Sequence, residues 1–394
     1  MKTTLLVIGL LVGLAAEILR VYFIMPFPGS QQSNTIDIAY WLHQNIYWIR
    51  IVCLGMIAWP VLQVLRKSAL WKKIALVIAL VLYGTVAYLF TFRFMADKMF
   101  IMPKVNRFLH ADLNKVPGDK LVIGVVAGGM AKAYPVQFIG YHHQVQDEVG
   151  GVPVLVTYCT VCRTGRVYIP IVDGRYEEFR LVGMDHFNAM FEDSTTKSWW
   201  RQVSGEAIIG PRKGKQLREV PSQQTTLSAW LQLHPDSWIL EPDAQYNKQY
   251  EHLAGFDKGT IESGLEKRDS GSWKMKSWVV GITQGTAAKA YDWNELVAKR
   301  MIQDTIAGKP VLLTLQRDTA SYHTLLPVLG DTTLQFSIRP GQDSLVDHGT
   351  GSVWDLAGNC TDGIYKGRQL RWVQSYQEFW HSWRTFHPST TRYP

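Results

Sequence analysis

Cysteine is scarce in this sequence of 394 residues, with only four: Cys53, Cys159, Cys162 and Cys360. So few cysteines exclude a disulfide framework of the kind that stabilises small secreted domains. Charged residues are also few, at 19% of the chain, and no run of five or more basic residues occurs. Although the net charge is +8, the lack of a basic tract disfavours a nucleic-acid-binding protein.

Hydrophobic residues make up 47% of the chain and are concentrated near its N-terminus. Three long apolar runs lie there, at Leu5–Phe27, Ile46–Leu65 and Ile74–Phe92. Each approaches the ~20 residues that a helix needs to cross a bilayer. A cleavable signal peptide is the alternative for the first run, but that run is long and two more follow. The sequence therefore predicts a transmembrane region over residues 1–100, with the lipid bilayer as its partner.

Basic residues in the short loops predict how these spans are oriented. The loop 66–73 carries the basic pairs Arg66-Lys67 and Lys72-Lys73, whereas the loop 28–45 contains no arginine and no lysine. Because basic loops stay in the cytoplasm, the N-terminus should be cytoplasmic and everything after about residue 95 should lie outside. In a bacterium, the protein would sit in the inner membrane with its main domain in the periplasm.

Charged residues also occur within the apolar runs. Glu17 and Arg20 are three residues apart, so they share a helix face and could neutralise each other. Arg50 opens the second run. Intramembrane charges are costly and are usually paired or functional. We expect a salt bridge here, with a role in transport as the alternative.

The rest of the chain contains an internal repeat. Segment 124–134 reads GVVAGGMAKAY, and segment 281–291, 157 positions later, reads GITQGTAAKAY. Further matches follow at an offset of 153, where Gly205, Gly210, Gly214, Leu217, Trp230 and His234 correspond to Gly358, Gly363, Gly367, Leu370, Trp383 and His387. A spacing this long and regular indicates duplication of one structural unit. The shared tryptophans and glycines are expected to shape the core and turns of both copies.

Each copy shows the pattern of a β-rich unit. Val152–Tyr158 and Lys309–Leu315 are short runs with β-branched residues, typical of buried strands. Leu227–His234 and Phe379–His387 are expected to be short helices that end before proline. The predicted fold is therefore a membrane-anchored α+β protein, with three transmembrane helices followed by two tandem β-rich repeats. Its domains are residues 1–100, a first repeat at 101–241, a connector at 242–272 and a second repeat at 273–394.

The cysteine pair Cys159-Thr-Val-Cys162 occurs only in the first copy. Two cysteines in this spacing can exchange a disulfide or bind a soft metal. The pair follows an apolar strand and precedes another, so we expect a strand-turn-strand in which Gly165 supplies the bend. A thioredoxin carries its pair at the start of a helix instead. Haem attachment is excluded because no histidine follows Cys162.

Thiol redox chemistry is the leading hypothesis for this pair. Arg163 and Arg166 would favour the nucleophilic thiolate, and His186, which the second copy lacks, would be the proton donor. No further cofactor is required for such chemistry, but a redox partner protein is. The alternatives are a zinc or copper site and a structural pair in a binding or scaffold module. Because the chain has no second cysteine pair, a metal site would need His186, His142 or His143 as further ligands.

Several motifs in order resemble the DUF3179 family, a domain of unknown function. They are the AKAYP motif at 131–135, GVPVLVTYCTVCRTG at 151–165 and FEDSTTKSWWRQVSGEAIIGPRKG at 191–214. The resemblance covers residues 120–240 strongly, and the second copy more weakly. It implies an exported or membrane-anchored bacterial protein. Some members are labelled as candidate selenoproteins, which favours redox chemistry at the pair. Relatives commonly have Cys-Pro-x-Cys-Gly, whereas this chain has Thr160 in place of the proline and Arg163 in place of the glycine.

Overall fold

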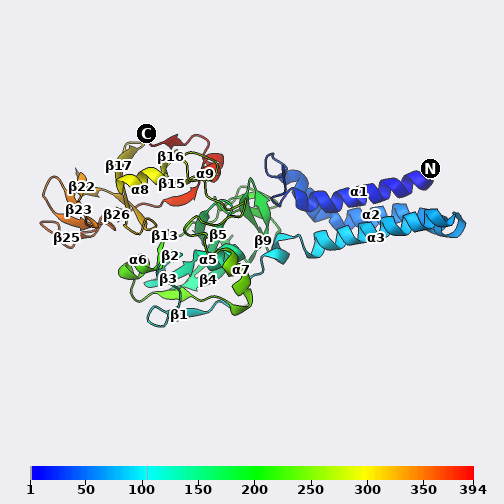
Figure 1. Ribbon diagram of the computed structural model, residues 1–394, viewed down its shortest axis with the longest axis horizontal. Coiled ribbons are helices and arrows are strands. Elements are labelled where there is room, and N and C mark those ends of the chain that lie inside the picture. The colour runs from blue at the N-terminus through cyan, green and yellow to red at the C-terminus, as the bar shows by residue number, and fades with distance from the viewer. Residues whose placement is uncertain (1, 104) are drawn as a thin grey trace. The chain divides into compact units, whose positions relative to one another are not determined.

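The computed structural model describes residues 2–103 and 105–394 (Figure 1). Contacts divide the chain into two compact units, which are described separately. The helix unit comprises Met1–Met102 and Glu177–Gln216, and the β unit comprises Pro103–Tyr176 and Leu217–Pro394. Residues 177–216 thus group with the N-terminal helices, although the sequence assigns them to the first repeat.

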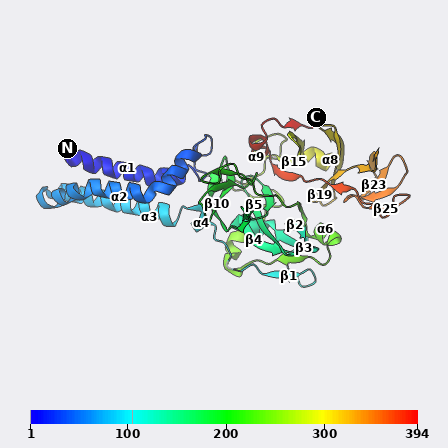
Figure 2. The same cartoon turned by 180° about the vertical axis from the view of Figure 1, so that it is seen from behind.

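Three long helices lie side by side in the helix unit (Figure 1; Figure 2 shows them from behind). They are α1 (Lys2–Tyr22), α2 (Ile36–Lys67) and α3 (Leu70–Phe92), and the short α4 (Ala96–Met99) follows. Each of the three is long and apolar enough to cross a membrane. The prediction of three membrane-spanning helices is confirmed, with one correction. The second helix begins ten residues before its apolar run, at Ile36, because Ala39 and Leu42 are buried against the rest of the unit.

The charged residues of the spans form one buried cluster. Arg50 donates from Nε to Glu17 Oε1 at 2.5 Å and from Nη2 to Glu17 Oε2 at 3.0 Å. Arg20 Nη2 donates to Glu17 Oε2 at 3.2 Å, so the predicted pair of Glu17 and Arg20 is confirmed. Both arginines also donate to Thr91 Oγ1 on α3. One carboxylate therefore links all three helices through two guanidinium groups.

A small antiparallel sheet completes the helix unit. Its order is β12-β11-β10-β9, and its strands are β9 (Phe179–Asp185), β10 (Asn188–Asp193), β11 (Trp199–Arg201) and β12 (Ala207–Ile209). Trp199 is fully buried, with its ring centroid 5.0 Å from that of Tyr40 on α2. The backbone of Met184 donates to the carbonyl of Ile24 at 2.7 Å. The sheet is thus held against the loop after α1 and the start of α2.

The first half of the β unit contains two sheets and a helix. One sheet has the order β1-β14-β3-β2-β13 and the other β4-β5-β6. The strands are β1 (Phe108–His110), β2 (Leu121–Ala127), β3 (Met130–Pro135), β4 (Gln144–Val149), β5 (Val152–Cys159), β6 (Thr164–Tyr168), β13 (Ser222–Thr226) and β14 (Trp238–Leu240). A hairpin of β7 (Ile171–Val172) and β8 (Arg175–Tyr176) follows β6, and the helices are α5 (Val136–His142) and α6 (Leu227–Leu233).

The second half holds sheets of order β27-β15-β16-β28, β17-β18-β19-β26 and β22-β23-β24-β25, and the hairpin β20-β21. The strands are β15 (Trp278–Gln284), β16 (Ala287–Asp292), β17 (Met301–Ile306), β18 (Lys309–Leu315), β19 (Tyr322–Leu326), β20 (Val328–Leu329), β21 (Thr332–Thr333), β22 (Phe336–Ile338), β23 (Ser344–Asp347), β24 (Val353–Asp355), β25 (Cys360–Asp362), β26 (Arg371–Trp372), β27 (Tyr376–Phe379) and β28 (Thr391–Arg392). Its helices are α8 (Trp293–Lys299) and α9 (Trp380–Phe386). The connector carries the short helices η1 (Ala244–Tyr246) and α7 (Asn247–His252).

The tryptophans that both halves share are buried in equivalent packing. Trp230 on α6 and Trp383 on α9 are at most 1% exposed. A Cβ atom on Gly124 would lie 2.2 Å from the Trp230 ring, and one on Gly281 would lie 2.2 Å from the Trp383 ring. Each glycine is therefore needed because an indole ring packs directly on a strand backbone. The sequence prediction that these residues shape the core is confirmed.

Candidate functional site

The cysteine pair lies at the turn between β5 and β6. Cys159 is the last residue of β5 and pairs with Thr164, the first residue of β6. This confirms the predicted strand-turn-strand, but the bend is made by another residue. Arg163 has a φ of 56°, in the left-handed region, whereas Gly165 is a regular member of β6. Gly165 is small because a Cβ atom there would lie 2.7 Å from Ile123 Cδ1.

Both cysteines are thiols and both are completely buried. Burial raises the pKa of Cys162 well above its usual value, and a hydrogen bond with the Cys159 side chain raises it further. A hydrogen bond with Ser382 acts in the opposite direction, but burial prevails. Because the thiolate is the reactive form, Cys162 is held in its unreactive state in this conformation.

Residues from the connector and the second half cover the turn. The backbone N–H of Phe379 donates to the carbonyl of Cys162 at 2.9 Å. The carbonyl of Val161 accepts from Lys276 Nζ at 3.2 Å and bonds His381 Nε2 at 3.2 Å. Thr160 Oγ1 donates to Glu266 Oε1 at 3.2 Å. The turn is thus enclosed by two later parts of the chain, which we call the cover: residues 266–276 and 379–382.

Two bases of the cover have lowered pKa values. Burial lowers the pKa of Lys276, while the neighbouring thiols of Cys162 and Cys159 counteract part of the shift. Burial also lowers the pKa of His381 to about 4, helped by the positive charge of Lys276. The raised pKa of Cys162 and the lowered pKa values of Lys276 and His381 therefore occur together at this turn.

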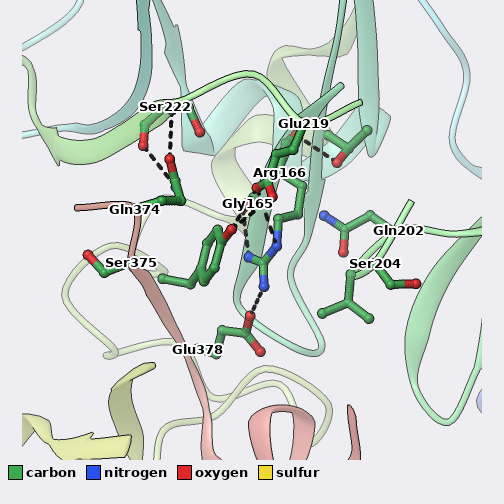
Figure 3. Close-up of polar contacts among 12 residues, drawn as sticks. Gly165, Arg166, Gln202, Ser204, Glu219, Ser222, Gln374, Ser375 and Glu378 are labelled. Atoms are coloured by element: carbon green, nitrogen blue, oxygen red, sulfur yellow. Dashed lines mark hydrogen bonds and ion pairs between the residues drawn. The ribbon is translucent and has the colours of Figure 1, made fainter. Parts of the chain in front are cut away.

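Arg163 and Arg166 follow the cysteines, and both guanidinium groups are buried. Arg163 donates to Gln377 Oε1 at 2.9 Å and to the carbonyl of Phe256 at 3.2 Å, and it stacks on Trp278 at 3.7 Å from the ring centroid. Arg166 forms an ion pair with Glu378, which Figure 3 shows. Burial alone would lower the pKa of Arg166, but Glu378, Tyr376 and Glu219 together more than reverse this and the pKa is raised.

These arginines hold the two halves of the β unit together. The sequence leads us to expect that they stabilise a thiolate, but the pKa of Cys162 is raised, chiefly by burial. Their guanidinium groups face Gln377 and Glu378 of β27 instead. In this conformation burial outweighs charges that are already engaged elsewhere, and a role of Arg163 and Arg166 in stabilising a thiolate stays a prediction.

His186 belongs to the helix unit, not to the β unit that holds the cysteines. It forms the hairpin turn between β9 and β10 with Phe187, and both residues have positive φ. Its Nδ1 lies 2.6 Å from Asp185 Oδ1, and Arg201 bonds the other oxygen of Asp185 at 2.6 Å. The backbone N–H of Phe187 donates to Gln31 in the loop after α1. These contacts tie the hairpin to the membrane helices, and a role of His186 as proton donor stays a prediction.

We expect the imidazole of His186 to stay protonated at pH values above the ordinary pKa of histidine. The hydrogen bond with Asp185 raises the pKa of His186 despite partial burial. Because the folded pKa exceeds the unfolded value of about 6.5, the imidazolium stabilises the hairpin fully below about pH 6.5 and progressively less as pH rises through the folded pKa. A titration of the histidine ring signals by NMR, with His186→Gln to assign the resonance, checks this. A midpoint at or below about 6.5 would contradict it.

His142 and His143 are buried in the β unit and engaged in its packing. His142 Nε2 lies 2.7 Å from the hydroxyl of Tyr250, and His143 Nδ1 lies 3.1 Å from the carbonyl of Tyr141. Within residues 2–103 and 105–394, no group of three or more His, Cys, Asp or Glu side chains is arranged to hold a metal ion. The alternative of a zinc or copper site at Cys159 and Cys162 therefore gains no support.

The other two cysteines lie elsewhere in the fold. Cys53 is buried on α2, as the sequence predicts for a small apolar residue of a span. Cys360 is buried at the start of β25, where its thiol donates to the carbonyl of Asp362 at 3.3 Å.

Sequence reasoning missed the residues that surround the thiols: Lys276, Glu378, His381 and Ser382. All lie more than one hundred positions after Cys162, so no local spacing connects them with the pair. One signal was nevertheless present in the sequence. At the offset of 153 positions, Glu378, His381 and Ser382 align with Thr225, Ser228 and Ala229. Titratable side chains therefore stand where the aligned positions have Thr225 and Ser228.

The three apolar helices and the β-rich remainder define a membrane-anchored protein with a domain of several small sheets. Residues 101–390 match the family model described as a protein of unknown function, DUF3179, and the chain belongs to this family. Comparison with curated proteins and with solved structures found no match.

Proposed function

We propose that this protein is a membrane-anchored thiol–disulfide protein whose exchanging pair is Cys159 and Cys162. The observation that carries the proposal is the hydrogen bond between the two side chains within a group of titratable residues. Two thiols in contact at a turn need little movement to form a disulfide. Lys276 and Ser382 also lie near the thiols and influence their proton affinity.

The proposed reaction is exchange with a disulfide of a partner protein. One thiolate attacks the partner disulfide, which gives a mixed disulfide and releases one partner thiolate. The second thiolate then attacks the first sulfur, which closes the Cys159–Cys162 disulfide and releases the other partner thiolate. The pair loses two electrons and two protons, and the partner disulfide gains both to become two thiols. The reverse reaction reduces the pair.

Lys276 is the proposed proton acceptor. Its lowered pKa increases the neutral fraction of its amine, which is the form that accepts a proton. The raised pKa of Cys162 opposes the transfer while the thiols are buried, so the transfer takes place when the turn opens and water reaches the sulfur. The charge of Lys276 after the transfer would stabilise the thiolate. The hydrogen bond of Ser382 lowers the pKa of Cys162 and would act in the same direction.

The complete burial of both thiols means that a partner reaches them only when part of the cover moves away. The contact of Thr160 with Glu266 must open, whereas Lys276 stays beside Val161 as the proton acceptor. This contact involves few residues, so a local opening is less costly than unfolding of the β unit. Exchange should therefore be slow in the resting protein and should accelerate when Glu266 is replaced by alanine.

A redox titration of the full chain in lipid nanodiscs tests the proposal. The protein is equilibrated with mixtures of reduced and oxidised dithiothreitol, its thiols are alkylated under acid quench, and the sites are assigned by mass spectrometry. We expect the free thiols of Cys159 and Cys162 to disappear together in one two-electron transition, while Cys53 and Cys360 stay reduced. A single Cys162→Ser or Cys159→Ser variant should instead accumulate a mixed disulfide with a small thiol probe.

A folded protein in which the pair stays reduced at every potential would refute the proposal. The unfolded chain in urea is the matched control, because both thiols are then accessible. If the pair oxidises only there, burial is structural and the pair belongs to a binding or scaffold module.

The architecture that we propose for this function has two parts related by duplication: residues 101–241 and 273–394, joined by the connector 242–272. The element order β2-β3-α5-β4-β5-β6 supports it, because β15-β16-α8-β17-β18-β19 repeats this order. Equivalent contacts also support it. Tyr134 bonds Asp147 at 2.7 Å and Tyr291 bonds Asp304 at 2.9 Å.

A pseudo-twofold relation between the two parts is also part of the proposal. Gln224 and Gln377 are equivalent at the offset of 153, and Gln224 Nε2 donates to Gln377 Oε1 at 2.7 Å. A bond between equivalent residues is what an approximate twofold axis produces. The cysteine turn and its counterpart, 316–321, would then each face the β-strand and helix of the other half.

We further propose that the β unit lies outside the cytoplasm, in the periplasm of a bacterial inner-membrane protein. The turn between α2 and α3 carries Arg66, Lys67, Lys72 and Lys73, whereas the loop 23–35 has no basic residue. This distribution supports a cytoplasmic N-terminus. An oxidising compartment would supply the disulfide-bearing partners that the reaction needs.

A further inference from the structure

The β unit contains a second feature that the thiol chemistry does not use. It is a cleft of about 520 Å³ on a different set of elements from the cysteine turn. Strand β2, strand β13 with the preceding Pro221, and helix α6 form one side, and residues 357–372 with His323 form the other. A volume of this size lies in the range of pockets that bind small molecules.

None of the fifteen residues that line this cleft is Asp, Glu, Lys or Arg. Neutral polar side chains take their place: Gln223, Gln232, His234, His323, Asn359 and Gln369. Burial lowers the pKa of both histidines, that of His323 to about 4, so neither carries a charge at neutral pH. The cleft therefore offers hydrogen-bond donors and acceptors without a net charge.

Part of this hydrogen-bonding capacity is unused. Gln223 Oε1 is buried without a hydrogen-bond partner among the described residues. Gln232 and Gln369 are exposed at the rim. Each amide can donate and accept at once, which matches a hydroxyl group that does the same. A buried polar atom without a partner is costly, so a ligand that supplies one would gain affinity.

Two tryptophans line the cleft. Trp230 is buried, its ring is tilted against that of His234 at a centroid distance of 4.1 Å, and its Nε1 donates to Ser237 Oγ. Trp372 on β26 is partly exposed. An indole whose face is accessible provides a flat apolar platform for a ring with C–H groups on one side.

We propose that this cleft binds a neutral sugar, a mono- or disaccharide whose ring lies on Trp372 while its hydroxyls bond the amides. An organic anion or cation would lose its hydration without gaining a countercharge. A purely apolar ligand would leave the amides without partners. The proposal is independent of the thiol reaction, because it rests on other residues.

Binding of defined sugars to the full chain in phosphatidylcholine nanodiscs tests this site. Maltoside detergents must be avoided because their head group is itself a disaccharide. Glucose, N-acetylglucosamine, maltose and chitobiose serve as neutral probes, and glucuronate and glucosamine serve as charged analogues. We expect saturable binding of at least one neutral probe by calorimetry, and at least tenfold weaker binding of both charged analogues.

Substitutions locate the binding. Trp372→Ala and Gln223→Ala should each weaken it by about tenfold or more, as expected for residues at the centre of a binding site. Trp238→Ala is the matched control, because Trp238 is a partly exposed tryptophan of the β unit outside this cleft. It should leave the affinity unchanged.

A dissociation constant of about 1 mM is a weak affinity on the usual scale. The proposal is overturned if none of the neutral probes binds at concentrations up to 50-fold above this value. It is also overturned if binding survives both Trp372→Ala and Gln223→Ala, since the sugar then sits elsewhere. If acetyl-Ala-Ala-amide bound and none of the sugars did, the cleft would be a peptide site and the proposal would also be rejected.

Discussion

Replacing Glu378 by glutamine should destabilise the β unit by about 3–5 kcal/mol. Glu378 and Arg166 form an ion pair in which both side chains are at most 2% exposed. The substitution keeps the size of the side chain but removes the negative charge, so the guanidinium stays buried without its counterion. Urea unfolding of the full chain, followed by tryptophan fluorescence, measures the loss.

Glu219→Gln is the matched control for this experiment. Glu219 is the second carboxylate near Arg166, with its Oε1 3.9 Å from Arg166 Nε, but its side chain is 33% exposed. Solvent screens such a contact, so we expect a loss of at most about 1 kcal/mol. The double variant Arg166→Met/Glu378→Leu should recover most of the stability, because no charge is then left buried. Equal losses for the two glutamine variants would show that the buried pair is not what holds the halves together.

Glu17→Gln should destabilise the membrane region by an amount comparable to the cost of one uncompensated arginine in a span, about 2.5–3.5 kcal/mol. Glu17 is completely buried and is the carboxylate that both Arg20 and Arg50 contact. Without it, two guanidinium groups remain between helices α1, α2 and α3. We expect a lower thermal midpoint in nanodiscs and faster proteolysis between the spans.

Arg20→Gln is the comparison for Glu17→Gln. It leaves the contact of Glu17 with Arg50 in place and brings the charge of the cluster to zero. Its effect should therefore be clearly smaller. If Arg20→Gln were the more damaging variant, the bonds of Arg20 to Phe90 and Thr91 would matter more than the charge balance.

The sequence predicts the local elements of the β unit well. Lys309–Leu315 is strand β18 with the same bounds, and Val152–Tyr158 is extended by one residue in β5. Leu227–His234 and Phe379–His387 each contain the expected short helix. These elements follow from side-chain patterns within a few residues, and a pattern of this kind needs no knowledge of the tertiary fold.

The surroundings of the thiols could not be predicted in the same way. The pKa of Cys162 depends on burial and on Ser382, both of which arise from contacts with the second half of the chain. Arginine next to cysteine in the sequence indicates a thiolate only when the guanidinium is free to face the sulfur. Arg163 and Arg166 bond Gln377 and Glu378 instead, and no local pattern indicates this.

The residues around position 190 also acquire a physical reason. Trp199 packs against Tyr40 and His43 of α2, and Phe187 bonds Gln31 after α1. These side chains thus attach the small sheet to the helices of the same unit, a role that no local sequence pattern indicates.

The enclosed cysteine turn has a consequence for the order of events during synthesis. The cover over Val161 includes His381, 220 residues further along the chain. Because the chain is synthesised from its N-terminus, both thiols lack this part of the cover while the second half is being made. Under the proposed function, oxidation of the pair would be easiest in this interval, before helix α9 is made. A disulfide formed then would persist in the folded protein until the cover opens.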